Sequence, residues 1–361
     1  MLTCSLIVLA VWQHGQGNGV PGWADVRSAF AAWDGAYYLH LADHGYPANL
    51  TPPGSNVWAF LPGFPLLIRA FEVVFRDPIL SGVMVSAGGE LIALVFVARI
   101  VMAERDVRSA WVAVWLLALA PYAVFFSVVY TESAFLAAAA GSLYFMRRGK
   151  FVPACILAAL AASIRITGLA LLPALLIEYA EQRRFRPRLD LVAVLLVVLP
   201  FSAFMLYGYL HAGDALAYFH TEASDSFHRG LTSPLTGLLT AYGQIGGPRG
   251  TGFVFASELL AGVFGTLACV GLWLWRPIGS WWRPPAVPLS FAAFATALLL
   301  PALTQPYWLS LGRYELGLTP LLLIAADGLR RKPEWTTGVI VASAALMTFV
   351  TVVWTSGAFV G

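Results

Sequence analysis

The sequence predicts an all-α polytopic membrane protein, a bundle of about 10–12 transmembrane helices whose external loops carry the functional residues. Hydrophobic residues make up 59% of the 361-residue chain and charged residues only 11%, whereas soluble domains average about 25% charged residues. The apolar runs are about 18–25 residues long, which is typical of membrane helices rather than of the roughly 10-residue alternating strands of a membrane barrel. A soluble core could not enclose this much apolar surface, so we expect lipid to cover most of it.

Apolar runs place the expected spans along the chain. They are residues 1–12, 79–103, 109–128, 131–147, 151–164, 167–181, 189–211, 251–275, 285–303, 308–329 and 335–357. The first run lacks the charged start and cleavage site of a signal peptide, so we interpret it as a membrane helix whose start is missing or misassigned. The runs 151–164 and 167–181 are each too short to cross about 30 Å of bilayer. Tilted helices, a re-entrant pair and one long broken helix all remain open for them.

Basic residues predict the orientation, with the whole of 1–361 as one membrane domain. They gather in five loops, near residues 105–108, 147–150, 183–188, 276–283 and 330–332. The positive-inside rule places these loops in the cytoplasm, provided that 151–181 enters the membrane and returns on the same side. The external side then contains the first loop, 13–78, with interfacial helices, and a long loop at 212–250. Within the first loop, 57–76 is either an interfacial helix or an incomplete dip into the membrane. We expect a multi-pass protein of the inner (plasma) membrane with its site on the extracytoplasmic side.

Asp34 is the most informative polar residue of the external side, because it lies between Trp33 and Gly35 in a chain that otherwise avoids charge. Two interpretations remain open. Asp34 could be the N-cap of a helix that starts Asp-Gly-Ala-Tyr-Tyr. It could instead be a general base in a cavity at the edge of the bilayer.

Two more polar groups lie on the external side. His40, Asp43 and His44 would share one helix face through i, i+3, i+4 spacing, which suits either a metal site or a polar surface. We expect no metal, because no fourth protein ligand stands at a recognisable spacing. Tyr130 and Glu132 begin a span, where Glu132 either is stabilised by the helix dipole or hydrogen-bonds a ligand hydroxyl.

Arg165 and Arg313 interrupt or border apolar runs on the external side. An ionisable residue at membrane depth indicates a functional site by default, and a guanidinium fork suits a phosphate. For Arg165 the alternative is a structural ion pair with Glu132 or Asp34. The long loop is either a solvated loop or a lid that faces a ligand, and its polar residues are His220, Glu222, Asp225, His228 and Arg229.

Four stretches resemble one known family in their order and spacing. They are W-D-G-x-Y-Y-x-x-x-A-x-x-G-Y-P at 33–47, FLPGFPLLIR at 60–69, the run 128–176 with YTES and SIRITG, and HAGDALAYFH at 211–220. They are similar to bacterial proteins related to the second GPI mannosyltransferase, the PIG-V family of the GT-C glycosyltransferases. The chain departs from the family pattern at Ala32, where arginine is common, and at Ile166, where proline is common.

The resemblance implies a GT-C-like bundle and an inverting glycosyltransferase. The enzyme would move a sugar, mannose in the first place, from a polyprenyl-phosphate carrier to a hydroxyl of a glycan, glycolipid or protein on the extracytoplasmic face. Asp34 matches the family's catalytic acid, while Arg165 and Arg313 are expected to bind the donor phosphate. No cofactor is implied. The expected substrate-binding residues are Trp33, Tyr37, Tyr130, Glu132 and His44.

Two functions from other classes remain open: a transporter or flippase for a lipid-linked or hydrophobic solute, and an inactive sugar- or lipid-binding scaffold. The net charge of +3 is too small to suggest a nucleic-acid partner. A transporter would carry polar residues through the full membrane depth and on both faces. The observation that separates it from the enzyme is whether Asp34, Glu132 and Arg165 converge on one cavity.

Overall fold

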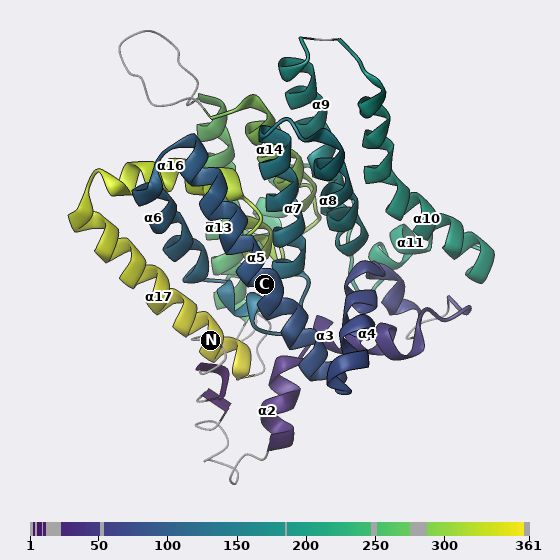
Figure 1. The fold of residues 1–361 in the computed structure, drawn as a ribbon. Helices are drawn as coiled ribbons and strands as arrows, with labels where there is room; N and C mark the ends of the chain where they lie inside the picture. The colour runs from purple at the N-terminus through teal and green to yellow at the C-terminus, as the bar shows by residue number, and fades with distance from the viewer. Residues whose placement is uncertain are drawn as a thin grey trace.

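The computed structural model describes residues 3, 6–8, 10–11, 23–50, 54–184, 186–246, 251–274 and 287–356. Every regular element in these ranges is a helix, and the helices form one bundle (Figure 1). The all-α class is therefore confirmed. Most of the expected span at 1–12 and the basic loop at 276–283 lie outside the described residues.

Four stretches of the described chain are long and apolar enough to cross a membrane. They are α5 (Pro78–Glu104), the 3-10 turn η4 (Leu189–Val194) continued by α10 (Leu195–Ala212), α13 (Thr251–Leu274) and α17 (Pro333–Thr355). Three shorter apolar helices accompany them, α6 (Val107–Ala118), α8 (Phe151–Ile164) and α14 (Leu289–Leu303). These lengths agree with a membrane protein, and the expected number of spans stays a prediction.

The centre of the bundle is α7 (Glu132–Arg147), which is buried over most of its length (Figure 1). Its small residues allow close packing, as in membrane helix pairs. Gly89 of α5 packs against the start of α7, where a Cβ atom would lie 2.8 Å from the backbone nitrogen of Ala134. A larger side chain at Gly89 would separate the helices. The first turn of α7, with Glu132, is thereby fixed deep in the bundle.

Residues 151–182 form a helical hairpin that returns to its starting side. Of the three alternatives for this stretch, this is the re-entrant pair. After α8 the chain turns at Arg165, continues as η3 (Ile166–Ala170) and returns as α9 (Leu171–Gln182). The two ends of the hairpin meet, since the rings of Phe151 and Tyr179 lie 4.6 Å apart. Gly168 permits the sharp turn, because a Cβ there would lie 2.3 Å from the nitrogen of Ala162. Arg165 is therefore at the apex, inside the bundle.

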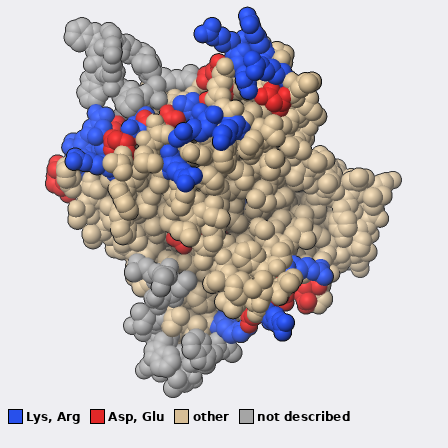
Figure 2. All heavy atoms as spheres, in the orientation of Figure 1, with Lys and Arg blue, Asp and Glu red and all other residues tan. Residues whose placement is uncertain are grey.

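Ion pairs collect four of the five basic loops at one end of the bundle. Arg147 contacts Glu104 and Glu178, each at 2.7 Å, and Arg330 at the end of α16 (Thr319–Arg330) contacts Asp106 at 3.0 Å. Figure 2 shows Lys and Arg gathered at the top, above a broad band with few charges, and a smaller group of charges at the bottom. This agrees with the loop grouping that predicts a cytoplasmic face.

The expected external segments are largely helical. The first loop contains α2 (Trp23–Phe30), α3 (Asp34–His44), the turn η1 (Gly54–Ala59) and α4 (Gly63–Phe75). Exposed apolar residues on α4, Leu66, Val73 and Val74, suit the interfacial helix that was expected there. The long loop contains α11 (Ala217–Glu222) and α12 (Pro234–Gln244).

Two expected spans are wrong in extent. The run 109–128 is not one helix, because α6 ends at Ala118 shortly before Pro121 and the chain continues as the 3-10 turn η2 (Ala123–Phe126). The run 308–329 divides into α15 (Leu311–Glu315) and α16, which begins at Thr319 with Pro320 in its first turn. Apolar composition conceals both breaks, and both lie beside the site described below.

We predict that Arg147→Ala destabilises the bundle by about 2 kcal/mol, since the change leaves the buried Glu178 carboxylate without its cation. The expected loss of stability is smaller than for a fully buried ion pair because the Arg147 side chain is 30% exposed. Thermal unfolding in detergent would measure the change. Arg148→Ala is the matched control, because that exposed side chain only lies over the Tyr144 ring. Equal melting temperatures for the two variants would contradict the prediction.

Candidate active site

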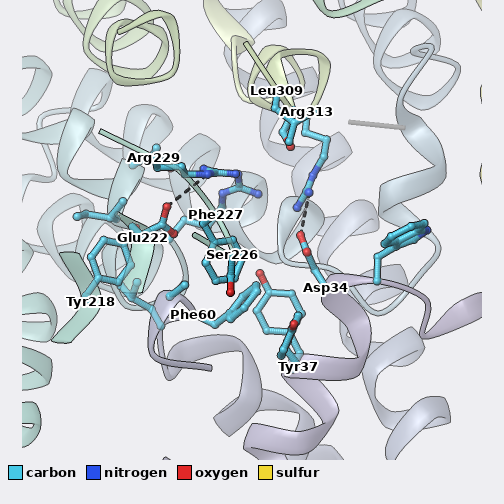
Figure 3. Close-up of a pocket in the computed structure, with 18 of the residues that line it drawn as sticks. Asp34, Tyr37, Phe60, Tyr218, Glu222, Ser226, Phe227, Arg229, Leu309 and Arg313 are labelled. Carbon is cyan, nitrogen blue, oxygen red and sulfur yellow. Dashed lines mark hydrogen bonds and ion pairs between the residues drawn. The ribbon is translucent and has the colours of Figure 1, made fainter. Parts of the chain in front are cut away.

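A cavity of about 550 Å³ opens between α3, η1, the apex of the α8–α9 hairpin, the 218–229 segment and α15. Its walls mix aromatic rings with a few charged groups, which is the composition of a small-molecule site. In Figure 3 the Glu222–Arg229 pair lies to the left of the Asp34–Arg313 pair, and Phe60 lies below both. The cavity therefore has two charged sides within one chamber.

Asp34 begins α3 and lines the cavity. The N-cap is Trp33, whose side chain makes no capping hydrogen bond, so the interpretation of Asp34 as the N-cap is wrong. Trp33 has a φ of 55°, which a bulky residue rarely adopts. The Tyr130 hydroxyl accepts the Asp34 N–H at 3.2 Å and donates to the Ala32 carbonyl at 3.4 Å. Tyr130, which is fully buried, therefore fixes the backbone that presents Asp34.

Arg313 joins Asp34 to Glu132. One Nη contacts Asp34 Oδ2 at 2.9 Å and Nε contacts Glu132 Oε1 at 2.6 Å. The guanidinium lies over the rings of Phe125 and Tyr130, with centroids at 5.0 and 4.7 Å, so cation–π attraction adds to the ion pairs. The Arg313 side chain is only 5% exposed. This arginine is thus held mainly by protein groups.

Arg165 converges on the same carboxylate. Its Nη1 donates to Glu132 Oε1 at 2.5 Å and to the Thr131 hydroxyl at 3.1 Å. Two guanidinium groups therefore share one buried oxygen. The proposed structural pair of Arg165 with Glu132 is present, and Arg165 also lines the cavity. Two cations and two anions balance in this network, which offsets the high cost of burying each charge alone.

Residues 218–229 of the long loop form one wall of the cavity, and a role of the loop as a lid stays a prediction. Glu222, Ser226, Phe227 and Arg229 all line it. Arg229 lies 3.3 Å from Glu222 Oε2 and donates to the Tyr314 hydroxyl at 3.3 Å. Burial raises the pKa of Glu222, while Arg229 opposes the increase. The loop is therefore part of the site and is not only a solvated connection.

Tyr314 links two of the three arginines that line the cavity, Arg165 and Arg229. The Arg165 guanidinium lies 5.2 Å from the centre of its ring, and Arg229 donates to its hydroxyl. Arg165 is 16% exposed and Arg229 30% exposed, so both are more accessible than Arg313. From the sequence, Arg229 was expected only as one of the polar residues of the long loop. The only sequence signal for a role of Arg229 in the site was its position in the long loop 212–250.

The other expected substrate-binding residues divide into two that line the cavity and three that do not. Trp33 and Tyr37 line the cavity, whereas Tyr130 and Glu132 lie behind it and hold Asp34 and the arginines. His44 is exposed at the end of α3, stacks on His40 at 4.7 Å, and is not among the cavity-lining residues. Within the described ranges no three His, Cys, Asp or Glu side chains come together to hold a metal. Metal independence stays a prediction.

Glu258 of α13 is a buried acid near the site that was not expected from the sequence. Its two oxygens accept the backbone N–H groups of Ser310 and Leu311, close to Arg313. The available signal was an acidic residue inside the apolar run 251–275, which the rule for intramembrane charges would have selected.

Comparison with known proteins identifies the family. A model of the family described as Mannosyltransferase (PIG-V) matches residues 23–222, which include Asp34, Glu132 and Arg165. This chain belongs to the PIG-V mannosyltransferase family. It is similar to GPI alpha-1,6-mannosyltransferase 2 of Mus musculus, with 28% identity over 206 residues, and of Rattus norvegicus, with 27% identity over 205 residues. Each match covers 49% of this chain and 40% of the relative, so this PIG-V family chain matches less than half of each relative's length.

A solved structure supports the fold of this PIG-V family member. The crystal structure of ArnT from Cupriavidus metallidurans bound to undecaprenyl phosphate superposes with a TM-score of 0.55 and 15% sequence identity, over 96% of this chain and 62% of that chain. The GT-C-like fold implied by the resemblance is therefore confirmed. Assignment to a bacterial subgroup of the PIG-V family stays a prediction.

We predict that Glu132→Gln destabilises the protein by about 3 kcal/mol, because two buried guanidinium groups lose their shared anion. Thermal unfolding of the purified protein would measure the loss. Glu181→Gln changes an exposed acid of α9 and is the matched control, for which we expect almost no change. A Glu132→Gln variant as stable as this control would show that the buried network contributes little.

Proposed function

We propose that the protein is an inverting glycosyltransferase that moves a sugar, mannose in the first place, from a polyprenyl-phosphate carrier to a hydroxyl acceptor. The reaction would take place on the extracytoplasmic side of the plasma membrane. The observation that carries the proposal is the presence of Asp34, Arg165 and Arg229 in one cavity. A carboxylate and two accessible guanidinium groups in one chamber supply a base and an anion site, which are the two elements that this reaction needs.

Asp34 is the proposed general base. As the acceptor oxygen attacks the anomeric carbon, its proton passes to the carboxylate, and the bond between that carbon and the phosphate oxygen breaks. The electron pair leaves with the phosphate on the opposite face of the sugar, so the configuration inverts. Arg313 holds Oδ2, and we assign Oδ1 to the acceptor hydroxyl. Because the arginine also contacts Glu132, the carboxylate can remain oriented during the reaction.

Arg165 and Arg229 are the proposed phosphate ligands. Both line the cavity, and both contact Tyr314. Fixed positive charges stabilise the negative charge that develops on the leaving phosphate, and guanidinium groups fit phosphate oxygens in pairs. Arg313 was expected to bind phosphate directly, but two carboxylates already hold it. We propose that it adds positive charge from behind Asp34.

The sugar is proposed to lie between Asp34 and the arginines. Trp33 and Tyr37 offer aromatic faces there, and Glu222 offers a carboxylate for sugar hydroxyls. Glu132 is assigned to hold the two arginines and not to contact the sugar, since one of its oxygens accepts from both. A volume of about 550 Å³ falls within the usual range for small-molecule sites.

A lipid-linked donor is supported from two directions. The ArnT structure, which shares this fold, was determined with undecaprenyl phosphate. In this chain α10 exposes apolar residues, Leu206 and Leu210 among them, along the helix that precedes the cavity wall. The acceptor is proposed to be a glycan, glycolipid or protein hydroxyl. The transporter alternative has less support, because Asp34, Arg165 and Arg229 line one chamber.

We predict that Asp34→Asn lowers the transfer rate by about 10²–10⁴-fold, since the amide cannot take the acceptor proton. The assay is transfer of radiolabelled mannose from polyprenyl-phosphate-mannose in membranes with matched protein levels. Asp43→Asn, an exposed change on the same helix, is the control and should retain activity. Near-normal transfer by Asp34→Asn would exclude Asp34 as the base.

We predict that Arg229→Ala raises the KM for the donor by roughly 10–100-fold, which is the expected cost of one charge-assisted contact to phosphate. Arg229→Lys should restore only part of the affinity, because an ammonium cannot form the paired contacts of a guanidinium. Asp225→Asn in the same loop is exposed and does not line the cavity, so it serves as control. An unchanged donor KM in both arginine variants would remove Arg229 from the phosphate site.

A further inference from the structure

Glu258 lies inside the apolar helix α13 and is fully buried. A carboxylate at such a position is costly unless its oxygens are hydrogen-bonded. Oε1 accepts the N–H of Ser310 at 2.9 Å and Oε2 accepts the N–H of Leu311 at 2.6 Å. Both oxygens are therefore used to hold one short piece of backbone, which lies more than 50 residues further along the chain.

That piece of backbone leads directly to Arg313. Ser310 has a φ of 66°, in the left-handed region that a residue with a side chain rarely adopts. The strain needs a compensating interaction, and the two hydrogen bonds to Glu258 lie at and next to the strained residue. Arg313 follows Leu311 by two residues in α15 and reaches Asp34 and Glu132 from there.

Packing leaves this segment little room to move. A Cβ at Gly262 of α13 would lie 2.5 Å from the Trp308 ring, and a Cβ at Gly312 would lie 2.1 Å from the Tyr122 ring. On one side of Ser310 the Trp308 ring thus packs against α13, and on the other side the backbone of Gly312 packs against the Tyr122 ring. Two glycines provide the space and Glu258 provides the polar contact, so the segment has a defined position relative to α13.

We propose that Glu258 is a positioning residue for Arg313 and, through it, for the Asp34 carboxylate. This inference rests on the proposed transferase function. Glu258 touches neither Asp34 nor the arginine side chain in the hydrogen bonds described above, and it acts through the backbone at 310–311. Its loss should therefore affect the orientation of the base and not the binding of the donor.

The test is Glu258→Gln, which keeps the size of the side chain but turns one acceptor into an NH₂ group that faces a backbone N–H. We expect kcat to fall by about 10–100-fold, because small misplacements of catalytic groups cost rates of that order. The donor KM should change by less than about threefold, as expected for an interaction that acts in the transition state. Thr266→Val is the control on the same helix, since its hydroxyl only bonds the Gly262 carbonyl.

A double-mutant cycle separates positioning from a general structural role. In an Arg313→Lys background, where the paired contacts to Asp34 and Glu132 are already lost, Glu258→Gln should cost less than about threefold in kcat. The full 10–100-fold loss in that background would overturn the inference, as would a loss carried by KM. Asp34→Asn is assayed in parallel to keep the two tests distinct. If Asp34→Asn is inactive while Glu258→Gln remains active, only the role of Glu258 is rejected.

A second readout does not depend on transfer. The melting temperatures of wild type, Glu258→Gln, Arg313→Lys and the double variant form a stability cycle in detergent. We expect the combined single losses to exceed the loss of the double variant by at least about 2 °C. Additive losses would overturn the inference even if the wild type transfers no mannose, an outcome that would separately reject the proposed function.

Discussion

The contact of Arg313 with Asp34 and Glu132 is the interaction on which the rest of the site depends. It joins residues that are 279 and 181 positions apart in the chain, and it places a cation between two carboxylates in an apolar interior. With Arg165 on the same Glu132 oxygen, the network is balanced in charge. An unpaired member would carry a large desolvation cost. The bundle must therefore bring all four side chains together for any of them to be stable.

The helices are arranged to meet that requirement. The small residues of α7 and Gly89 of α5 let Glu132 begin a helix in the middle of the bundle. The α8–α9 hairpin places Arg165 at its apex, where the sharp turn depends on the close approach of Gly168 to α8. A break in an apolar run also helps to bring these side chains together, because it produces α15, the short helix that carries Arg313. Irregular backbone in a membrane bundle is tolerated where protein covers it or where it lines a cavity.

The chamber has two sides, which the proposed function assigns to different chemical tasks. On one side a carboxylate is held rigidly by a buried arginine and by the Tyr130 hydroxyl. On the other side Arg165 and Arg229 are partly accessible around Tyr314. A rigid base and an accessible anion site are what the proposed transfer from a phosphate carrier requires. Membership of the PIG-V mannosyltransferase family agrees with this division. The 218–229 segment, which is part of the long loop, contributes Arg229 to the accessible side.

The sequence by itself determined the class of protein and part of the site. Few charges and long apolar runs indicate membrane helices because unpaired charges are costly in lipid, and the same cost made Arg165 stand out. The motif around Trp33 and Asp34 indicated the proposed base. Only the tertiary structure decided the partners of Arg313, the place of Arg229 in the cavity wall and the role proposed for Glu258. These depend on contacts between distant segments and on helix breaks hidden within apolar runs, and neither hydrophobicity nor local spacing encodes them.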